Sequence, residues 1–188
     1  MVNRLNILIL VGLLLATALS TKAQDTNVAT QPVKLQVAGS ALVAVFGPPV
    51  VLQLAGAKEA GDSISTAAEN DLTRLRISSL VQDNELRSIT ARLSEELVGT
   101  QLLVDLKNPN ANFKYPLAKG ELKGPQVLSN ESDAVLVEGI GTCWSGRGED
   151  DGYVIKYVYK AIQGAPILKG SDVTITYTIT LVPSDARE

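Results

Sequence analysis

One short stretch of the sequence, GTCWSGRGEDDGYV from Gly141 to Val154, combines several side chains that could bind or react. It holds the only cysteine and the only tryptophan of the chain, and a loop rich in glycine and acidic residues follows them. An exposed aromatic ring beside a polar loop is suited to stacking on a sugar or contacting a partner protein. The candidate ligand-binding residues are Trp144 and, in the loop Ser145 to Gly152, the charged residues Arg147, Glu149, Asp150 and Asp151.

Each of these residues also has a structural interpretation. Trp144 could cover the end of a sandwich, and Cys143 could be a small buried side chain or form a disulfide between molecules. The acidic residues could offer oxygens to calcium, but their spacing does not match the alternating acids and closing glutamate of an EF-hand. We therefore expect no metal site, and we interpret GRGEDDG as the solvated tip of a β-hairpin, with Cys143 inside and Trp144 near the surface.

The composition removes whole classes of catalytic site. The sequence has no histidine, so it lacks the commonest general base, the usual zinc ligand and any Ser-His or Cys-His pair. No lysine lies close enough in sequence to Cys143 to lower its pKa. We predict that the protein is not an enzyme and needs no cofactor. A hydrolase built on a carboxylate pair or a Ser-Lys arrangement is the alternative left open.

The first residues predict export. Residues 1–23 combine an early Arg4, an apolar run from Leu5 to Leu19 and the small residue Ala23, the layout of a cleavable signal peptide. We expect residues 24–32 to be a flexible mature N-terminus and residues 33–188 to form a single domain. Cleavage after Ala23 leaves 15 basic and 20 acidic side chains, a net charge of −5. The predicted product is secreted, periplasmic or on the cell surface, with no transmembrane segment and no nucleic-acid partner.

Alternating apolar and polar residues predict an all-β protein. In VTITYTITLV, one strand face carries Val173, Ile175, Tyr177, Ile179 and Leu181, and the other carries threonines. One buried and one wet face per strand predicts an antiparallel β-sandwich, of immunoglobulin or pilin-like type. The predicted strands are residues 33–37, 41–46, 50–54, 75–81, 87–93, 101–106, 134–140, 153–161 and 173–182.

Three parts of the sequence are less regular. Residues 85–97 fit either a helix or a strand, and we favour the strand. Residues 57–72 could be a long loop or contain a helical turn, and residues 107–124 are predicted to be a loop with one short edge strand. Basic residues on two neighbouring predicted strands could form a basic stripe or a solvated face with scattered ion pairs. They are Arg74, Arg76, Arg87 and Arg92.

A set of strand and turn sequences carries a resemblance. The stretches LRISSLV, LRSITARLS, GTQLLVDL, LVEGIGTCWSG, GYVIKYVYKA and VTITYTIT resemble a group of uncharacterised secreted bacterial β-sandwich proteins. These are in turn distantly similar to pilin-like and spore-coat-type surface subunits. The resemblance covers residues 72–180 and includes no catalytic signature. It implies an exported β-sandwich that works by binding or assembly.

Two segments favour assembly on physical grounds. VTITYTITLV has ten residues without charge or proline, so an unpaired edge there would attract another strand. PVKLQVAG, residues 32–39, could be the strand that a neighbouring subunit donates; alternatively, both segments pair within their own domain. The predicted function is a fimbrial or pilin-like structural or adhesive subunit, which binds itself or other surface proteins and glycans. The alternative is a glycan- or ligand-binding module that uses Trp144 and the loop Ser145 to Gly152.

Overall fold

The structure is a computed structural model that describes residues 31–82, 85–108 and 118–182. The predicted signal peptide and all but the last two residues of the predicted flexible N-terminus lie outside this part. The chain divides into two units, Met1–Gln36 and Val37–Glu188. In the first unit, the described residues 31–36 are exposed and belong to no strand.

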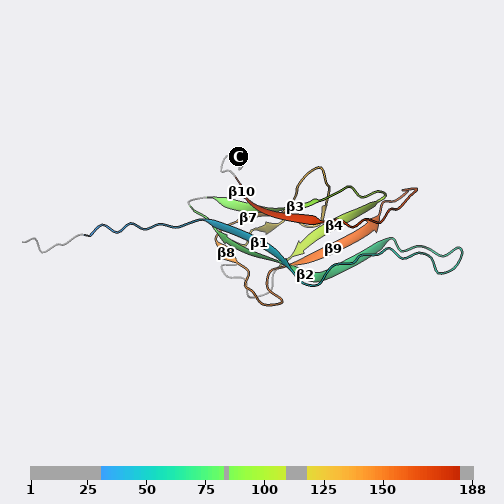
Figure 1. The fold of residues 1–188 in the computed structure, drawn as a ribbon, viewed down its shortest axis with the longest axis horizontal. Helices are drawn as coiled ribbons and strands as arrows, with labels where there is room; N and C mark the ends of the chain where they lie inside the picture. Colours follow the sequence, from blue (N-terminus) through green and yellow to red (C-terminus); the bar gives the residue numbers. More distant parts are fainter. Residues whose placement is uncertain (1–30, 83–84, 109–117, 183–188) are drawn as a thin grey trace, which may run out of the picture. The chain divides into compact units, whose positions relative to one another are not determined.

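The second unit is all-β, and its strands form two antiparallel sheets (Figure 1). The first sheet has the order β1-β2-β9-β4-β6, with β8 also paired to β2, and the second has the order β10-β3-β7-β5. The strands are β1 (Ser40–Phe46), β2 (Ala67–Leu80), β3 (Leu86–Leu93), β4 (Thr100–Lys107), β5 (Glu121–Leu122), β6 (Gln126–Val127), β7 (Ala134–Ile140), β8 (Cys143–Trp144), β9 (Tyr153–Ala161) and β10 (Ile175–Val182).

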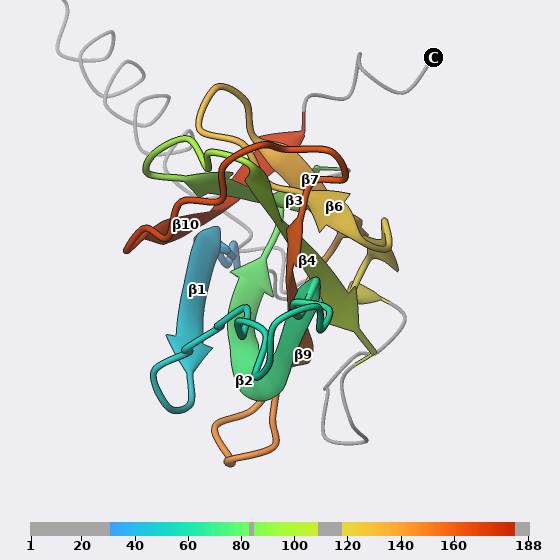
Figure 2. The same cartoon turned by 90° about the vertical axis from the view of Figure 1, so that its right-hand side faces the viewer.

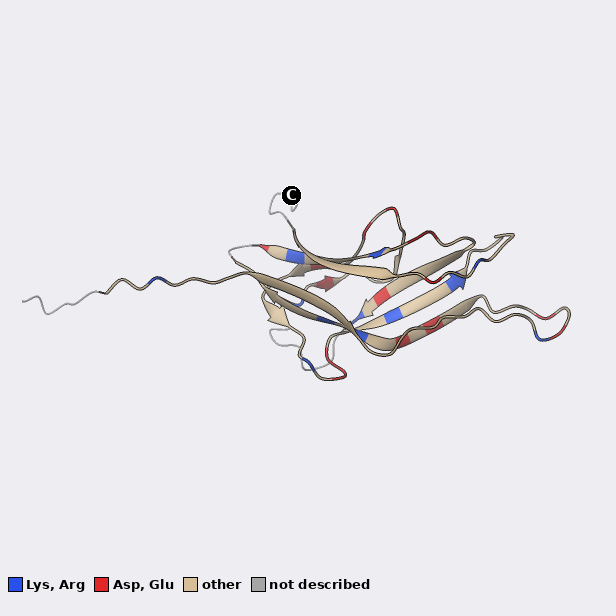
Figure 3. Cartoon of the chain, viewed as in Figure 1, with Lys and Arg blue, Asp and Glu red and all other residues tan. Residues whose placement is uncertain are grey.

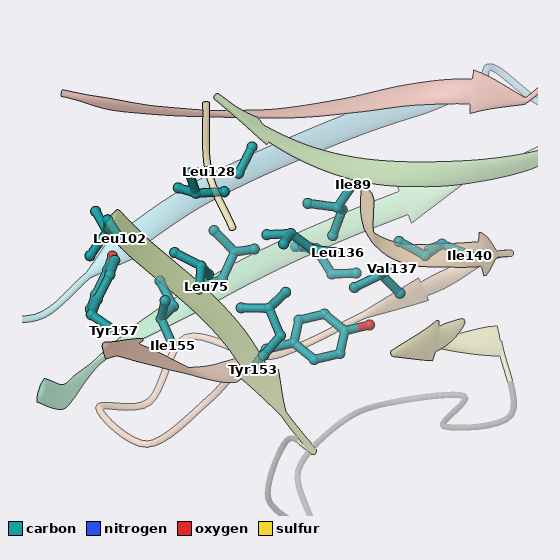
Figure 4. Close-up of a cluster of buried hydrophobic side chains, with 14 of the residues drawn as sticks. Leu75, Ile89, Leu102, Leu128, Leu136, Val137, Ile140, Tyr153, Ile155 and Tyr157 are labelled. Carbon is teal, nitrogen blue, oxygen red and sulfur yellow. The ribbon is translucent and has the colours of Figure 1, made fainter. Parts of the chain in front are cut away.

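The two sheets pack face to face, as in a β-sandwich, and one apolar core lies between them (Figure 4). Leu75 of β2 and Ile155 of β9 come from the first sheet, and Ile89 of β3 and Leu136 of β7 from the second. All four side chains are almost completely buried. Removing such side chains from water is the main force that stabilises a sandwich without a disulfide.

Most of the predicted strands are confirmed, including the segment that fitted both a helix and a strand, which is β3. The alternation predicted for β10 is also confirmed, and β9 alternates in the same way. Tyr153 and Tyr157 of β9 are buried, and the threonines of β10 are exposed. Alternation predicts such strands well because one face of each packs on the core and the other meets solvent.

Three predictions about the strands are wrong. Residues 33–37 and 50–54 form no strand, and β2 begins at Ala67, inside the segment predicted as a loop or helical turn. Residues 50–54 follow Pro48 and Pro49, which have no N–H groups to donate to a ladder, and Val50 and Leu52 pack on the core from outside the sheets. The early part of β2 is polar and mostly exposed. Its backbone pairing with β9, and not the burial of apolar side chains, holds it as a strand.

Of the two interpretations of the four arginines, the basic stripe does not form. Arg74 and Arg76 lie on β2 in the first sheet, whereas Arg87 and Arg92 lie on β3 in the second. The connection between these strands passes from one sheet to the other, so neighbours in sequence are not neighbours in a sheet.

The two sides of the sandwich end in different strands. On one side, which we call the open side, the edges are β1 and β10, and these two strands contact each other (Figure 2). On the other, which we call the short-edge side, the edges are β5 and β6, of two residues each. Within the described part of the chain, β1 pairs only with β2 and β10 pairs only with β3.

Candidate functional site

The loop from Ser145 to Gly152 is not the tip of a hairpin. Both β8 and β9 pair antiparallel with β2, Cys143 opposite Ser79 and Tyr153 opposite Leu75. The two strands therefore run in the same direction along the same edge of β2, and residues 145–152 loop out between them. The predicted hairpin is wrong because β7 ends at Ile140 in the second sheet, and the chain then crosses to β2 in the first.

Both ends of the loop are fixed to β2. Ser145 is buried, its N–H donates to the Ile77 carbonyl at 3.0 Å, and its Oγ accepts from the Ile77 N–H at 3.0 Å. At the other end, Gly152 has φ = +107°, and a Cβ there would lie 2.5 Å from the Leu75 carbonyl oxygen. Only glycine allows the chain to return to the sheet this closely.

The interior of the loop is organised by Asp151, which is buried with 6% of its surface exposed. Its Oδ2 accepts a hydrogen bond from the Gly148 N–H at 2.6 Å, and its own N–H donates to the Gly148 carbonyl at 3.1 Å. This reciprocal pair closes a turn within the loop. Asp151 therefore holds the backbone, and its carboxylate does not face solvent with the other acidic residues.

Two arginines of β2 hold the outer part of the loop. Arg76 Nη2 donates to the Gly148 carbonyl at 2.5 Å, and its guanidinium stacks 3.6 Å from the centre of the Phe46 ring. Arg74 Nη2 lies 3.6 Å from Asp150 Oδ1. An arginine that stacks and hydrogen-bonds at once loses much of its freedom of motion, so the loop has a defined shape.

The predicted site residues divide between surface and interior. Trp144 is 42% exposed, whereas the neighbouring Cys143 is buried, as predicted. Arg147, Glu149 and Asp150 are exposed, and Asp151 turns inward. No group of three metal-binding side chains is present among the described residues. The loop thus offers a half-exposed indole ring and a few surface charges.

The environment of Cys143 makes it unreactive. Its side chain is fully buried, and burial raises the pKa of the thiol from 9.0 to about 11. Since the thiolate is the nucleophilic form, very little reactive sulfur is present near neutral pH. A disulfide between molecules would also require the strand around Cys143 to open.

A second candidate site was missed by sequence reasoning. A cavity of about 780 Å³ lies between the sheets, where β10 faces β4 and β9, and residues 50–54 and 168–174 line its mouth. None of the five predicted site residues lines it. The alternation of tyrosines in YVIKYVYKA could have indicated that Tyr157 and Tyr159 face inward. No pattern in the sequence could have indicated that residues 50–54 and 168–174 meet these strands around a cavity.

Comparisons with known proteins assign no family. The chain matches no protein-family model, and no curated protein or solved structure is detectably similar to it. In the described residues, no helix has the length and apolar character needed to cross a membrane. The function of this chain is therefore inferred from its own sequence and geometry.

Proposed function

We propose that this chain is an exported, non-catalytic structural subunit that assembles with copies of itself by adding strands at the open side. The observation that carries the proposal is the pair of uncharged edge strands there, SALVAVF in β1 and ITYTITLV in β10 (Figure 3). The unpaired N–H and C=O groups of a sheet edge are a template for another strand. Soluble proteins normally protect such edges with lysine, proline or a bulge, and neither strand sequence contains lysine or proline.

A segment with the character of a strand is available to pair with these edges. Val33, Leu35 and Val37 alternate with polar residues and are 69%, 88% and 58% exposed, yet the segment belongs to no strand of its own fold. Adding it to β10 of a neighbouring molecule would pair its backbone and cover its apolar side chains. In this arrangement each subunit gives one strand and receives one, so the contact is head-to-tail and can continue into a fibre.

The remaining parts of the proposal rest on the sequence. The predicted signal peptide supports export, and the resemblance to pilin-like surface subunits supports an immunoglobulin or pilin-like type of sandwich. Together with the open edges, these features favour a fimbrial or adhesive component of a cell surface over a free enzyme.

The test uses a lysine placed on the edge and a matched lysine placed one strand further in. Thr178 of β10 lies opposite Thr90 of β3, so both side chains are on the same face of the sheet. We expect the wild-type mature chain to form higher species in native mass spectrometry, Thr178→Lys to remain a monomer, and Thr90→Lys to assemble like the wild type. A wild-type protein that stays strictly monomeric at every concentration would overturn the proposal.

Trp144 favours a second function, recognition of a glycan or another surface ligand. Its half-exposed ring stands beside a loop that β2 holds in one shape, and a rigid aromatic platform is suited to stacking on a sugar ring. Because Trp144 is the only tryptophan, its fluorescence reports binding directly. Screening against a glycan array should give a ligand that shifts this fluorescence and loses binding in Trp144→Ala. If no glycan does so, recognition of a glycan is ruled out.

A further inference from the structure

The cavity between the sheets has the size and lining of a small-molecule site. Its volume of about 780 Å³ falls within the 300–1,000 Å³ that is common for ligand pockets. Aliphatic side chains form much of its wall, among them Val50, Leu52, Leu102, Leu168 and Ile175. Figure 4 shows Leu102 and Tyr157 together at one end of the core cluster. The assembly proposed above does not use this space.

Two pairs of hydroxyl groups interrupt the apolar wall. The Tyr177 and Tyr157 hydroxyls are hydrogen-bonded at 3.1 Å, and the Tyr159 hydroxyl is bonded to Thr100 Oγ1 at 3.1 Å. Each pair holds two hydroxyl hydrogens and uses only one of them within the pair. Thr100 is 2% exposed and Tyr157 is 5% exposed, so neither has free access to bulk water.

The remaining hydrogen of each pair has no acceptor among the described residues. Burial raises the pKa of Tyr177 well above its ordinary value, so its hydroxyl keeps its proton over the physiological range. A buried donor without an acceptor costs free energy, and a ligand oxygen would remove that cost. The cavity therefore offers two hydrogen-bond donors to whatever occupies it.

The charged residues at the cavity favour neither an anionic nor a cationic ligand. Lys169 and Asp172 are the charged residues that line it, both are exposed, and their charges cancel. The other polar side chains that line the cavity are hydroxyl groups and the amide of Gln53, none of which carries a charge. Burying an ionised carboxylate or ammonium group there would leave it without a counter-charge.

We propose that this cavity binds an uncharged, lipid-like molecule, an aliphatic chain that carries an ester or ketone oxygen. The chain contacts the leucine and valine wall, and the oxygen accepts a hydrogen bond from the Tyr157–Tyr177 pair or the Tyr159–Thr100 pair. This site uses side chains of β1 and β10 that line the cavity, whereas the proposed assembly uses the backbone edge of β10; it is separate from the Trp144 loop.

The test is displacement of a neutral naphthylamine dye from the full-length chain by three matched probes: methyl decanoate, decanoate and decane. We expect methyl decanoate to displace the dye at the lowest concentration, because decane lacks an acceptor and decanoate is charged. One of the two variants Thr100→Val and Tyr157→Phe, the one that removes the donor to the ester, should weaken binding of methyl decanoate by about three- to tenfold, the equivalent of one hydrogen bond. Both should leave binding of decane unchanged, and no effect of either variant on methyl decanoate would contradict the proposal.

Two further variants separate the cavity from unspecific effects. Leu52→Trp fills the cavity and should abolish dye binding. Leu72→Trp adds the same ring at an exposed position of β2 outside the cavity and should leave binding intact. Circular dichroism melting curves establish that each variant is folded. Equal displacement by the ester and the alkane, stronger binding of decanoate, or no binding of any probe by the folded wild type would each overturn the proposal.

Discussion

The open side and the short-edge side of the sandwich differ in how well their edge strands are protected against pairing with another molecule. On the short-edge side, β5 and β6 have two residues each, and β4 next to β6 carries an ion pair between Lys107 and Asp105. On the open side, β1 and β10 are seven and eight residues long and carry no charge. Short strands and charges are the usual protection against edge-to-edge pairing.

This difference indicates that the protein can protect an edge and does so on one side only. Lys123 and Glu138 add a further ion pair, with Nζ and Oε2 2.5 Å apart, beside β5. Side chains such as Leu42 and Val45 remain exposed on β1. Uncharged edges on one selected side are expected of a subunit that must pair there and nowhere else.

The largest expected effect is a loss of stability, and it differs between two isoleucines, one in each region. Ile140 of β7 is fully buried near the short-edge side, whereas Ile179 of β10 is only half-buried. We expect Ile140→Ala to lower the free energy of unfolding of the monomer by about 2–5 kcal/mol, and Ile179→Ala by less than half as much. Urea unfolding at low protein concentration measures both. Equal losses would mean that β10 is as well packed as the interior strands, and the comparison would fail.

A second prediction concerns pH and the closed interior around Cys143. Because burial raises the pKa of this thiol from 9.0 to about 11, the unfolded chain loses the proton first as the pH rises. Its contribution to stability is therefore complete below pH 9.0 and is lost as the pH rises toward 11. Chemical unfolding across this window should show a shallower fall in Cys143→Ala than in the wild type. Identical slopes would mean that the interior at β8 is open to water.

A third prediction places the same charge on each side. Leu42 of β1 and Val127 of β6 are 68% and 52% exposed, so both tolerate lysine at the surface. We expect Leu42→Lys to weaken self-association by about tenfold, or about 1.4 kcal/mol, and Val127→Lys to leave it unchanged. Sedimentation velocity over a concentration series measures this. If association weakened only in Val127→Lys, the contact would lie on the short-edge side, and the proposal would be wrong.

The sequence predicts the sheets better than the candidate sites, because the alternation of apolar and polar residues shows which side chains are buried. In β9 and β10, alternate residues from Tyr153 to Tyr159 and from Ile175 to Ile179 pack on the core. That pattern requires no knowledge of the partner strand. It also predicts correctly that Cys143 and Trp144 face in opposite directions, since adjacent side chains in a strand do so.

What the sequence could not predict depends on where strands meet. The acidic loop was interpreted as a hairpin because turn residues separate two strands, and nothing in GRGEDDG shows that both strands lie along β2. The burial of Asp151 and the hydrogen bond from Arg76 to the Gly148 carbonyl follow from that arrangement. The cavity is lined by segments that are far apart in the chain, and no local pattern shows that they meet.

The central claim is that the segment around Leu35 of one molecule pairs with β10 of another. The most direct measurement mixes a Leu35→Cys protein with either a Thr178→Cys or a Val127→Cys protein under oxidising conditions. The account predicts a mixed disulfide dimer with Thr178→Cys on the open side and none with Val127→Cys on the short-edge side, while the buried Cys143 stays reduced. Equal cross-linking of both partners, or no dimer with Thr178→Cys, would contradict it.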